Sequence, residues 1–241
     1  MPVGVIVNGL SVLLGGAAGA LVGKGLKQDW KDKLTLIMGC CSMCIGIQSI
    51  ILMVNMPAVV FSVIIGMVIG ILLQLSKGIT GAARWAESKL SRKVEEDPDR
   101  TNLLVTAVVL FCASGTGIYG SIVSGMTGDN SILIAKSILD FFTAMIFACN
   151  LGIVVSAVSV PQVLIFLVLF FLGGPISRVA DETMICDFKA CGGFIMLATG
   201  FRIAGICPFS VADMLPAMIL VMPVSRLWTT VIQPLVAALA G

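Results

Sequence analysis

Long apolar runs alternate with short polar segments along almost the whole chain. Each run is close to the ~20 helical residues that cross the roughly 30 Å hydrocarbon core of a bilayer. The pattern therefore predicts an all-α polytopic helical membrane protein of about eight transmembrane helices, forming a single transmembrane domain over residues 1–241. The predicted spans are residues 3–22, 34–53, 57–75, 102–124, 131–150, 152–174, 190–207 and 212–230.

Composition favours lipid over water as the main solvent. Hydrophobic residues make up 58% of the chain and charged residues 12%, whereas soluble domains carry about 25% charged residues. The small net charge of +2 is spread over several loops, so we expect the lipid bilayer and no nucleic acid as a partner.

Histidine is absent, and the sequence contains no nucleotide-binding, dinucleotide or nucleophile-elbow motif. We therefore expect no cofactor, no metal site and no enzymatic activity.

Basic residues are distributed unevenly among the predicted loops. Residues 23–33 hold four lysines and residues 76–101 hold six lysines and arginines, whereas residues 54–57 and 125–130 hold none. Because cytoplasmic loops are enriched in lysine and arginine, the two basic segments are predicted to be cytoplasmic and the amino terminus to lie outside. The segment 76–101 also has the pattern of an interfacial amphipathic helix with a solvated loop.

A displacement of 158 residues brings two parts of the chain into register. Leu14-Gly15-Gly16 falls on Leu172-Gly173-Gly174, and Asp29-Trp30-Lys31 falls on Asp187-Phe188-Lys189. Both aspartate-aromatic-lysine triplets lie in predicted connecting loops. Five spans separate equivalent points, so the pattern indicates an inverted duplication, an arrangement found in many secondary transporters. The predicted parts are a first three-helix unit (1–75), a cytoplasmic amphipathic helix and loop (76–101), a central helix pair (102–150) and a second three-helix unit (151–241).

The predicted fifth span carries a polar stripe. Lys136, Asp140, Thr143 and Asn150 follow one another at intervals of 4, 3 and 7 residues, which place them along one face of a helix. A charge at the centre of a span costs about 2.5–3.5 kcal/mol, so Asp140 is expected to face protein or water and to pair with Lys136. Two interpretations remain open, namely an ion pair that only fixes helix packing and a group that coordinates a solute or ion.

The predicted fourth span contains Ser114-Gly115-Thr116-Gly117 and Tyr119-Gly120-Ser121. Each glycine costs a helix about 1 kcal/mol relative to alanine. The run is therefore expected to unwind and to expose peptide groups that can hold a solute. The alternative is close packing of small residues.

Arg202 lies far enough inside the predicted seventh span to need snorkelling or a counter-ion. Asp140 and Asp213 are the candidate partners, and a guanidinium also suits a carboxylate or phosphate of a substrate.

Two stripes of small residues allow another helix to approach closely. One contains Gly15 and Gly19 and the other Gly66 and Gly70. Helix packing inside the chain is the first interpretation, and a homo-oligomer contact is the alternative.

Several segments resemble one family. Gly125-Met126-Thr127-Gly128-Asp129, followed by Lys136-Ser137-Ile138-Leu139-Asp140, is similar to the central signature of the YdfK/YqgA family of bacterial membrane proteins of unknown function. Met1-Pro2-Val3-Gly4 with Asn8-Gly9 looks like the opening of that family, and Asp213-Met214-Leu215-Pro216-Ala217 looks like a late segment of it. The resemblance implies a multi-pass protein of the bacterial inner membrane with a role in transport, and it implies no substrate.

Together these features predict a secondary transporter or facilitator of a small solute. A carboxylate or an amino acid is the first substrate class and an inorganic ion the second. A non-transporting scaffold or sensor, whose polar residues only hold helices together, is the alternative from another class. The predicted substrate-binding residues are Ser114, Gly115, Thr116, Gly117, Tyr119, Lys136, Asp140, Thr143 and Arg202.

Overall fold

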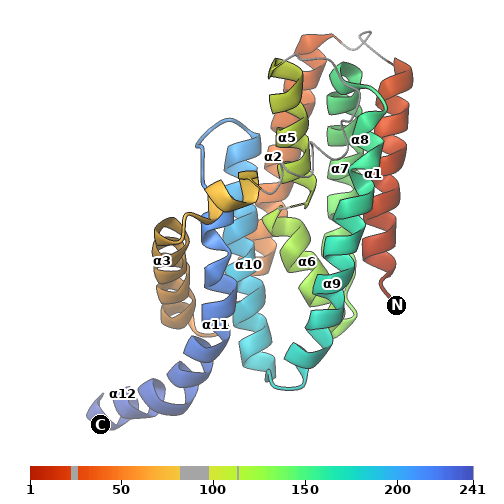
Figure 1. Cartoon of the computed structure of the whole chain (residues 1–241). Coiled ribbons are helices and arrows are strands. Elements are labelled where there is room, and N and C mark those ends of the chain that lie inside the picture. Colours follow the sequence, from red (N-terminus) through yellow and green to blue (C-terminus); the bar gives the residue numbers. More distant parts are fainter. Residues whose placement is uncertain (23–26, 82–97, 113, 241) are drawn as a thin grey trace.

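The computed structural model describes residues 1–22, 27–81, 98–112 and 114–240, and these residues form helices joined by short turns, with no strand among them. Figure 1 shows long helices packed side by side, with both termini toward the same end of the bundle. The helices are α1 (Val3–Val22), α2 (Gln28–Ile50), α3 (Met56–Leu72), α5 (Pro98–Cys112), α6 (Gly115–Thr127), α7 (Ser131–Leu151), α8 (Val154–Ala157), α9 (Ser159–Ser177), α10 (Glu182–Ile203), α11 (Pro216–Leu227) and α12 (Gln233–Ala240). The 3-10 turn η2 (Val211–Met214) precedes α11, and the π-helical segment η3 (Trp228–Ile232) joins α11 to α12.

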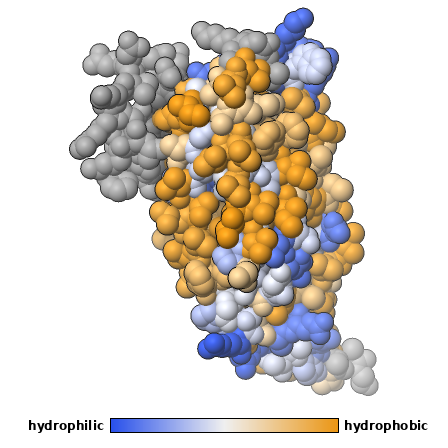
Figure 2. Space-filling model, turned by 90° about the vertical axis from the view of Figure 1, so that its right-hand side faces the viewer, coloured by the Kyte–Doolittle hydropathy of each residue, from blue (hydrophilic) through white to orange (hydrophobic). Residues whose placement is uncertain are grey.

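The described part of the chain confirms the prediction of an all-α polytopic membrane protein. Seven stretches are long and apolar enough to cross a bilayer, and α3 with the short helix Leu75–Gly81, bent by 56°, supplies an eighth if the two form one broken span. Figure 2 shows hydrophobic residues over the middle of one face and hydrophilic residues gathered toward both ends, the distribution expected of a protein embedded in lipid. Most of the predicted amphipathic helix lies in residues 82–97, outside the described residues.

Two spans begin earlier than predicted. α2 starts at Gln28 and α10 at Glu182, several residues before the apolar runs begin. The Asp29–Lys33 ion pair (2.8 Å) stabilises the first turns of α2, and the Asp181 side chain accepts a hydrogen bond from the backbone N–H of Met184 (2.8 Å). Both aspartate-aromatic-lysine triplets therefore lie in helices, and their predicted placement in loops was wrong. Hydropathy detects only the apolar part of a helix, so it missed these polar first turns.

Glycines bring the helices into close contact in pairs. A Cβ at Gly15 or Gly19 of α1 would overlap the backbone carbonyls of Phe141 and Met145 on α7. Small residues permit this approach because nothing separates the two backbones.

The second stripe of small residues is used in the same way. Gly66 and Gly70 of α3 lie directly against the backbones of Ala217 and Asp213. Both stripes are therefore used in helix contacts inside the chain, which is the first interpretation of these faces.

Candidate functional site

The predicted fourth span, residues 102–124, is interrupted near its middle, at Ser114. α5 ends at Cys112, and Ser114 caps α6 by accepting a hydrogen bond from the backbone N–H of Gly117 (3.4 Å). The predicted unwinding through Ser121 was wrong, because Gly115 to Ser121 are regular helix. Glycine here serves packing, since a Cβ at Gly115 would overlap the side chain of Ile195.

A cavity of about 330 Å³ opens at this interruption. It lies among α2, α5, α6, α7 and α10, next to η2 and the short helix Leu75–Gly81, and its size suits a small metabolite. Its polar lining consists of Thr35, Thr80, Thr106, Ser114, Thr143, Thr199 and Arg202. We call it the Arg202 cavity.

The N-terminal end of α6 borders the Arg202 cavity, because Ser114 and Gly115 line it. The first N–H groups of a helix have no partner within that helix and carry a partial positive charge. The cavity wall therefore combines a guanidinium, a helix N-terminus and several hydroxyls, which together suit a small anion.

The Arg202 side chain makes no ion pair or hydrogen bond within residues 1–22, 27–81, 98–112 and 114–240, and Arg202 lines the cavity without a counter-ion there. It is exposed in the last turn of α10, nearer the helix end than the sequence predicted. Neither predicted partner contacts it. Asp140 pairs with Lys136, and the carboxylate of Asp213 accepts hydrogen bonds from the backbone N–H of Ser76 (2.9 Å) and the hydroxyl of Ser210 (2.5 Å).

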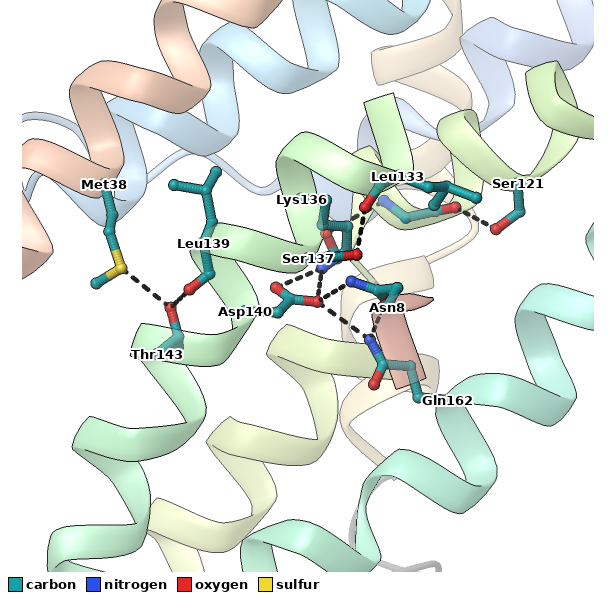
Figure 3. Close-up of polar contacts among 12 residues, drawn as sticks. Asn8, Met38, Ser121, Leu133, Lys136, Ser137, Leu139, Asp140, Thr143 and Gln162 are labelled. Carbon is teal, nitrogen blue, oxygen red and sulfur yellow. Dashed lines mark hydrogen bonds and ion pairs between the residues drawn. The ribbon is translucent and has the colours of Figure 1, made fainter. Parts of the chain in front are cut away.

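Lys136 and Asp140 form a buried ion pair, as their spacing predicts (Figure 3). The Lys136 Nζ lies 2.6 Å from Oδ2 and 2.7 Å from Oδ1 of Asp140, and the two residues are only 3% and 6% exposed. Oδ2 also accepts hydrogen bonds from the amides of Asn8 on α1 (2.9 Å) and Gln162 on α9 (3.2 Å). The Gln162 amide donates in turn to Asn8 Oδ1 (2.8 Å).

These four residues, which we call the Asp140 cluster, join α1, α7 and α9. Lys136 and Asp140 do not line the Arg202 cavity. A carboxylate with a lysine and two amides around it has little capacity left for a solute, so the geometry favours the interpretation that the pair fixes helix packing. Of the predicted polar stripe, only Thr143 lines the Arg202 cavity. Its hydroxyl donates a hydrogen bond to the carbonyl of Leu139 (2.8 Å).

The structure thus divides the predicted site. Ser114, Gly115, Thr143 and Arg202 line the Arg202 cavity. The other five predicted residues do not line this cavity. Thr116 is buried, and Gly117 packs against Phe166 and the Lys136 side chain. Lys136 and Asp140 belong to the Asp140 cluster, and Tyr119 lines a second cavity.

Sequence reasoning missed two groups of polar residues. Thr35, Thr80 and Thr199 line the Arg202 cavity, but threonine is tolerated in any membrane helix and gives no signal of its own. Asn8 and Gln162 complete the Asp140 cluster, and here a signal existed, because an amide within an apolar span needs a partner.

The long apolar helices of the described residues define a polytopic helical membrane protein. The sequence profile of the family described as "Protein of unknown function (DUF554)" matches residues 3–226, and the chain belongs to this family. The "Uncharacterized protein YqgA" of Escherichia coli (strain K12) is 46% identical over 231 residues, covering 95% of this chain and 98% of that protein. The "Uncharacterized membrane protein YdfK" of Bacillus subtilis (strain 168) is 26% identical over 227 residues, covering 90% and 93% of the two chains. No solved structure matches the chain.

These comparisons confirm the resemblance that the segments around residues 125–140 indicated.

Proposed function

We propose that the protein is a secondary transporter or facilitator of a small solute that carries a carboxylate, with no enzymatic step. The observation that carries this proposal is Arg202, which lines a cavity together with six hydroxyl side chains and has no counter-ion among the described residues. Arg202 is exposed in the last turn of α10, so its charge can be reached by a solute that enters the cavity.

The contrast with Lys136 favours transport over a scaffold. The chain satisfies the buried charge of Lys136 internally, with Asp140 at 2.6 Å. It leaves Arg202 available, beside the N-terminal end of α6. A carboxylate would receive charge-assisted hydrogen bonds from both groups.

The helix contacts support the inverted repeat that accompanies many transporters. In the proposed repeat, α1 is equivalent to α9, α2 to α10 and α3 to α11. If the two units are inverted copies, the helix that contacts α7 in the first unit should have an equivalent that contacts α6 in the second. α1 packs against α7, and its equivalent α9 packs against α6, while α2 packs on α10 and α3 on α11. The equivalent residues Gly15 and Gly173 both lie against the backbone of a central helix.

We propose an inner-membrane location with the Arg202 cavity facing the cytoplasm and the amino terminus outside. Lys27, Lys31, Lys33 and Lys77 lie at the end of the bundle that holds this cavity, since Thr35 and Thr80 of the same segments line it. Lysine-rich ends face the cytoplasm in bacterial membrane proteins.

Cysteine labelling tests this orientation. Cys207 is exposed in the turn after α10, at the Arg202 end, whereas Thr127 is exposed at the opposite end of α6. With the other seven of the eight cysteines replaced, a membrane-impermeant maleimide should label Cys207 only after cells are permeabilised. In a cysteine-free background, Thr127→Cys should react in intact cells, and the reverse pattern would rule out the proposed orientation.

Uptake by proteoliposomes tests the function. Labelled small carboxylates and amino acids are screened first, and the transported solute is then used with Arg202 variants. Arg202→Ala should lower uptake about 10- to 100-fold, because a charge-assisted hydrogen bond contributes about 1.5–3 kcal/mol. Arg202→Lys should retain part of the activity, since it keeps the charge and loses the planar fork.

The matched control for this experiment is Arg226→Ala. Arg226 is an exposed arginine in the last turn of α11, away from the Arg202 cavity, and its removal should leave uptake unchanged. Wild-type uptake rates in the Arg202→Ala protein would contradict the proposal.

A further inference from the structure

A second cavity of about 390 Å³ lies among α2, α6, α7 and α10, four of the five helices that border the Arg202 cavity. Its polar lining consists of Gln48, Ser49, Tyr119, Asp129, Ser131 and Lys189. We call it the Tyr119 cavity. Two features of its wall indicate a ligand. One is a buried hydroxyl without a hydrogen-bond partner, and the other is two side chains of opposite charge that do not pair with each other.

The Tyr119 hydroxyl lacks a hydrogen-bond partner. The side chain is fully buried, and its oxygen accepts and donates no hydrogen bond within the described residues. Ser49 lies beside this oxygen, but its own proton is donated to the carbonyl of Ile45 (3.1 Å), so it could only accept from Tyr119, and no hydrogen bond of normal geometry joins the two hydroxyls. An unsatisfied buried hydroxyl is costly, so its position at a cavity wall indicates a group that binds there.

The Tyr119 ring cannot turn away to satisfy its hydroxyl elsewhere. A Cβ at Gly192 would overlap the ring, so α10 and the ring are already in tight contact. The Phe188 ring packs against it with a centroid separation of 6.1 Å. The hydroxyl is therefore held in place before any ligand arrives, which reduces the ordering cost of binding.

Asp129 and Lys189 put opposite charges on the wall of this cavity without forming an ion pair within 4.0 Å. Hydrogen bonds from Ser131, one of them from its backbone N–H (2.9 Å), hold the pKa of Asp129 below its usual range, and the Lys189 charge adds to the effect. Asp129 thus remains ionised at neutral pH. Two separated charges of opposite sign match a solute that carries both an ammonium and a carboxylate.

The two cavities lie toward opposite ends of α2, α7 and α10. Arg202 and Lys189 are 13 residues apart on α10, or about 20 Å along the helix axis. Between them, Ile195 and Met196 are fully buried, and Ser42 of α2 donates a hydrogen bond to the Met196 carbonyl (3.1 Å). A packed barrier between two polar cavities is the arrangement that a carrier with access from either side requires.

We propose that the Tyr119 cavity is a second solute site, on the opposite side of the barrier from Arg202, and that it binds a small zwitterion of the α-amino acid type. Lys189 and the Tyr119 hydroxyl would receive the carboxylate, and Asp129 would receive the ammonium. This inference rests on the proposed transport function and narrows its substrate class from carboxylates to α-amino acids.

Binding to the purified full-length protein tests the proposal independently of transport. The probes are the L-α-amino acids, tested singly by isothermal calorimetry and by the shift in thermal midpoint, together with the matched acids that lack the amino group and the matched amines that lack the carboxylate. A ligand stabilises the folded state that it binds. At least one amino acid should bind, and its two singly charged counterparts should bind at least about 10-fold more weakly, because each leaves one wall charge unpaired.

Tyr119→Phe separates a ligand role from a structural one. It should weaken amino-acid binding about 10-fold and leave the thermal midpoint of the free protein unchanged or higher, because the lost hydroxyl bonds to nothing in the empty protein. Ser62→Ala is the control. Its buried hydroxyl donates to the carbonyl of Ala58 (2.7 Å) on α3, so this variant should lower the midpoint without changing amino-acid affinity.

The outcomes keep the two proposals distinct. If Arg202→Ala abolishes uptake while Tyr119→Phe and Lys189→Gln leave binding and uptake unchanged, the transport proposal stands and the Tyr119 site is overturned. Failure of every amino acid to bind, or equal binding of the acids without an amino group, also overturns the zwitterion site. Amino-acid binding that weakens in Tyr119→Phe, in a protein that shows no uptake, supports the site and contradicts transport.

Discussion

Asp140→Asn should lower the free energy of unfolding by about 3–5 kcal/mol, because it leaves the buried ammonium of Lys136 without a counter-charge. Lys136 is 3% exposed, and it lies 2.6 Å from the carboxylate that the substitution neutralises. The Asn8 and Gln162 amides, which donate to the same oxygen, lose a charged acceptor. Denaturation of the purified protein in detergent measures the loss, and Lys136→Met added to Asp140→Asn should recover part of it by removing the stranded charge.

The chain supplies its own control for this experiment. Asp29 and Lys33 form an ion pair with the same spacing of four residues, but their side chains are 67% and 75% exposed. Asp29→Asn should therefore change stability by less than about 1 kcal/mol. Equal effects of Asp140→Asn and Asp29→Asn on stability would mean that the Asp140 cluster is hydrated. Lys136 and Asp140 would then again be candidate solute-binding residues.

Gly173→Ala should destabilise the protein by about 1–3 kcal/mol, because the added methyl group forces two helices apart. Its Cβ would lie 2.6 Å from the carbonyl oxygen of Ile122 and 2.8 Å from Cα of Gly125, and neither backbone atom can move alone. The repeat-equivalent Gly15→Ala should be destabilising for the same reason, since its Cβ would overlap the carbonyl of Phe141. The same denaturation assay measures both.

Gly78→Ala is the matched control for these glycine variants. Gly78 lies in the short helix Leu75–Gly81, and an added Cβ there meets nothing within 4 Å. Alanine should then be neutral or stabilising by up to about 1 kcal/mol, because it has the higher helix propensity. A Gly173→Ala protein as stable as the Gly78→Ala protein would show that α6 and α9 do not depend on this close approach.

The fold was predictable where local rules apply. Predicted spans such as residues 3–22 and 131–150 coincide within a residue with α1 and α7, because the apolar length needed to cross a bilayer is a property of a single helix. Ends outside the hydrocarbon were less predictable. α2 extends back to Gln28 through charged residues that hydropathy assigns to a loop.

The candidate site was predictable only in part, since a site depends on which helix faces meet. Ser114 and Thr143 were selected for their hydroxyls, and both line the Arg202 cavity. Lys136 was selected for its charge, yet it lies in the Asp140 cluster, away from the cavity. Asp129 and Lys189 were not selected, because no local pattern reports that the turn after α6 lies beside α10.

The sequence by itself determined the apolar spans and the pairing of Lys136 with Asp140, because both follow from distances within one helix. Only the tertiary structure decided what these charges can do. Asn8 reaches Asp140 from 132 positions away and Gln162 from 22, and together they surround its carboxylate inside the protein. Arg202 receives no such neighbours from the described residues, so its charge remains available to a solute, and this difference arises from helix packing.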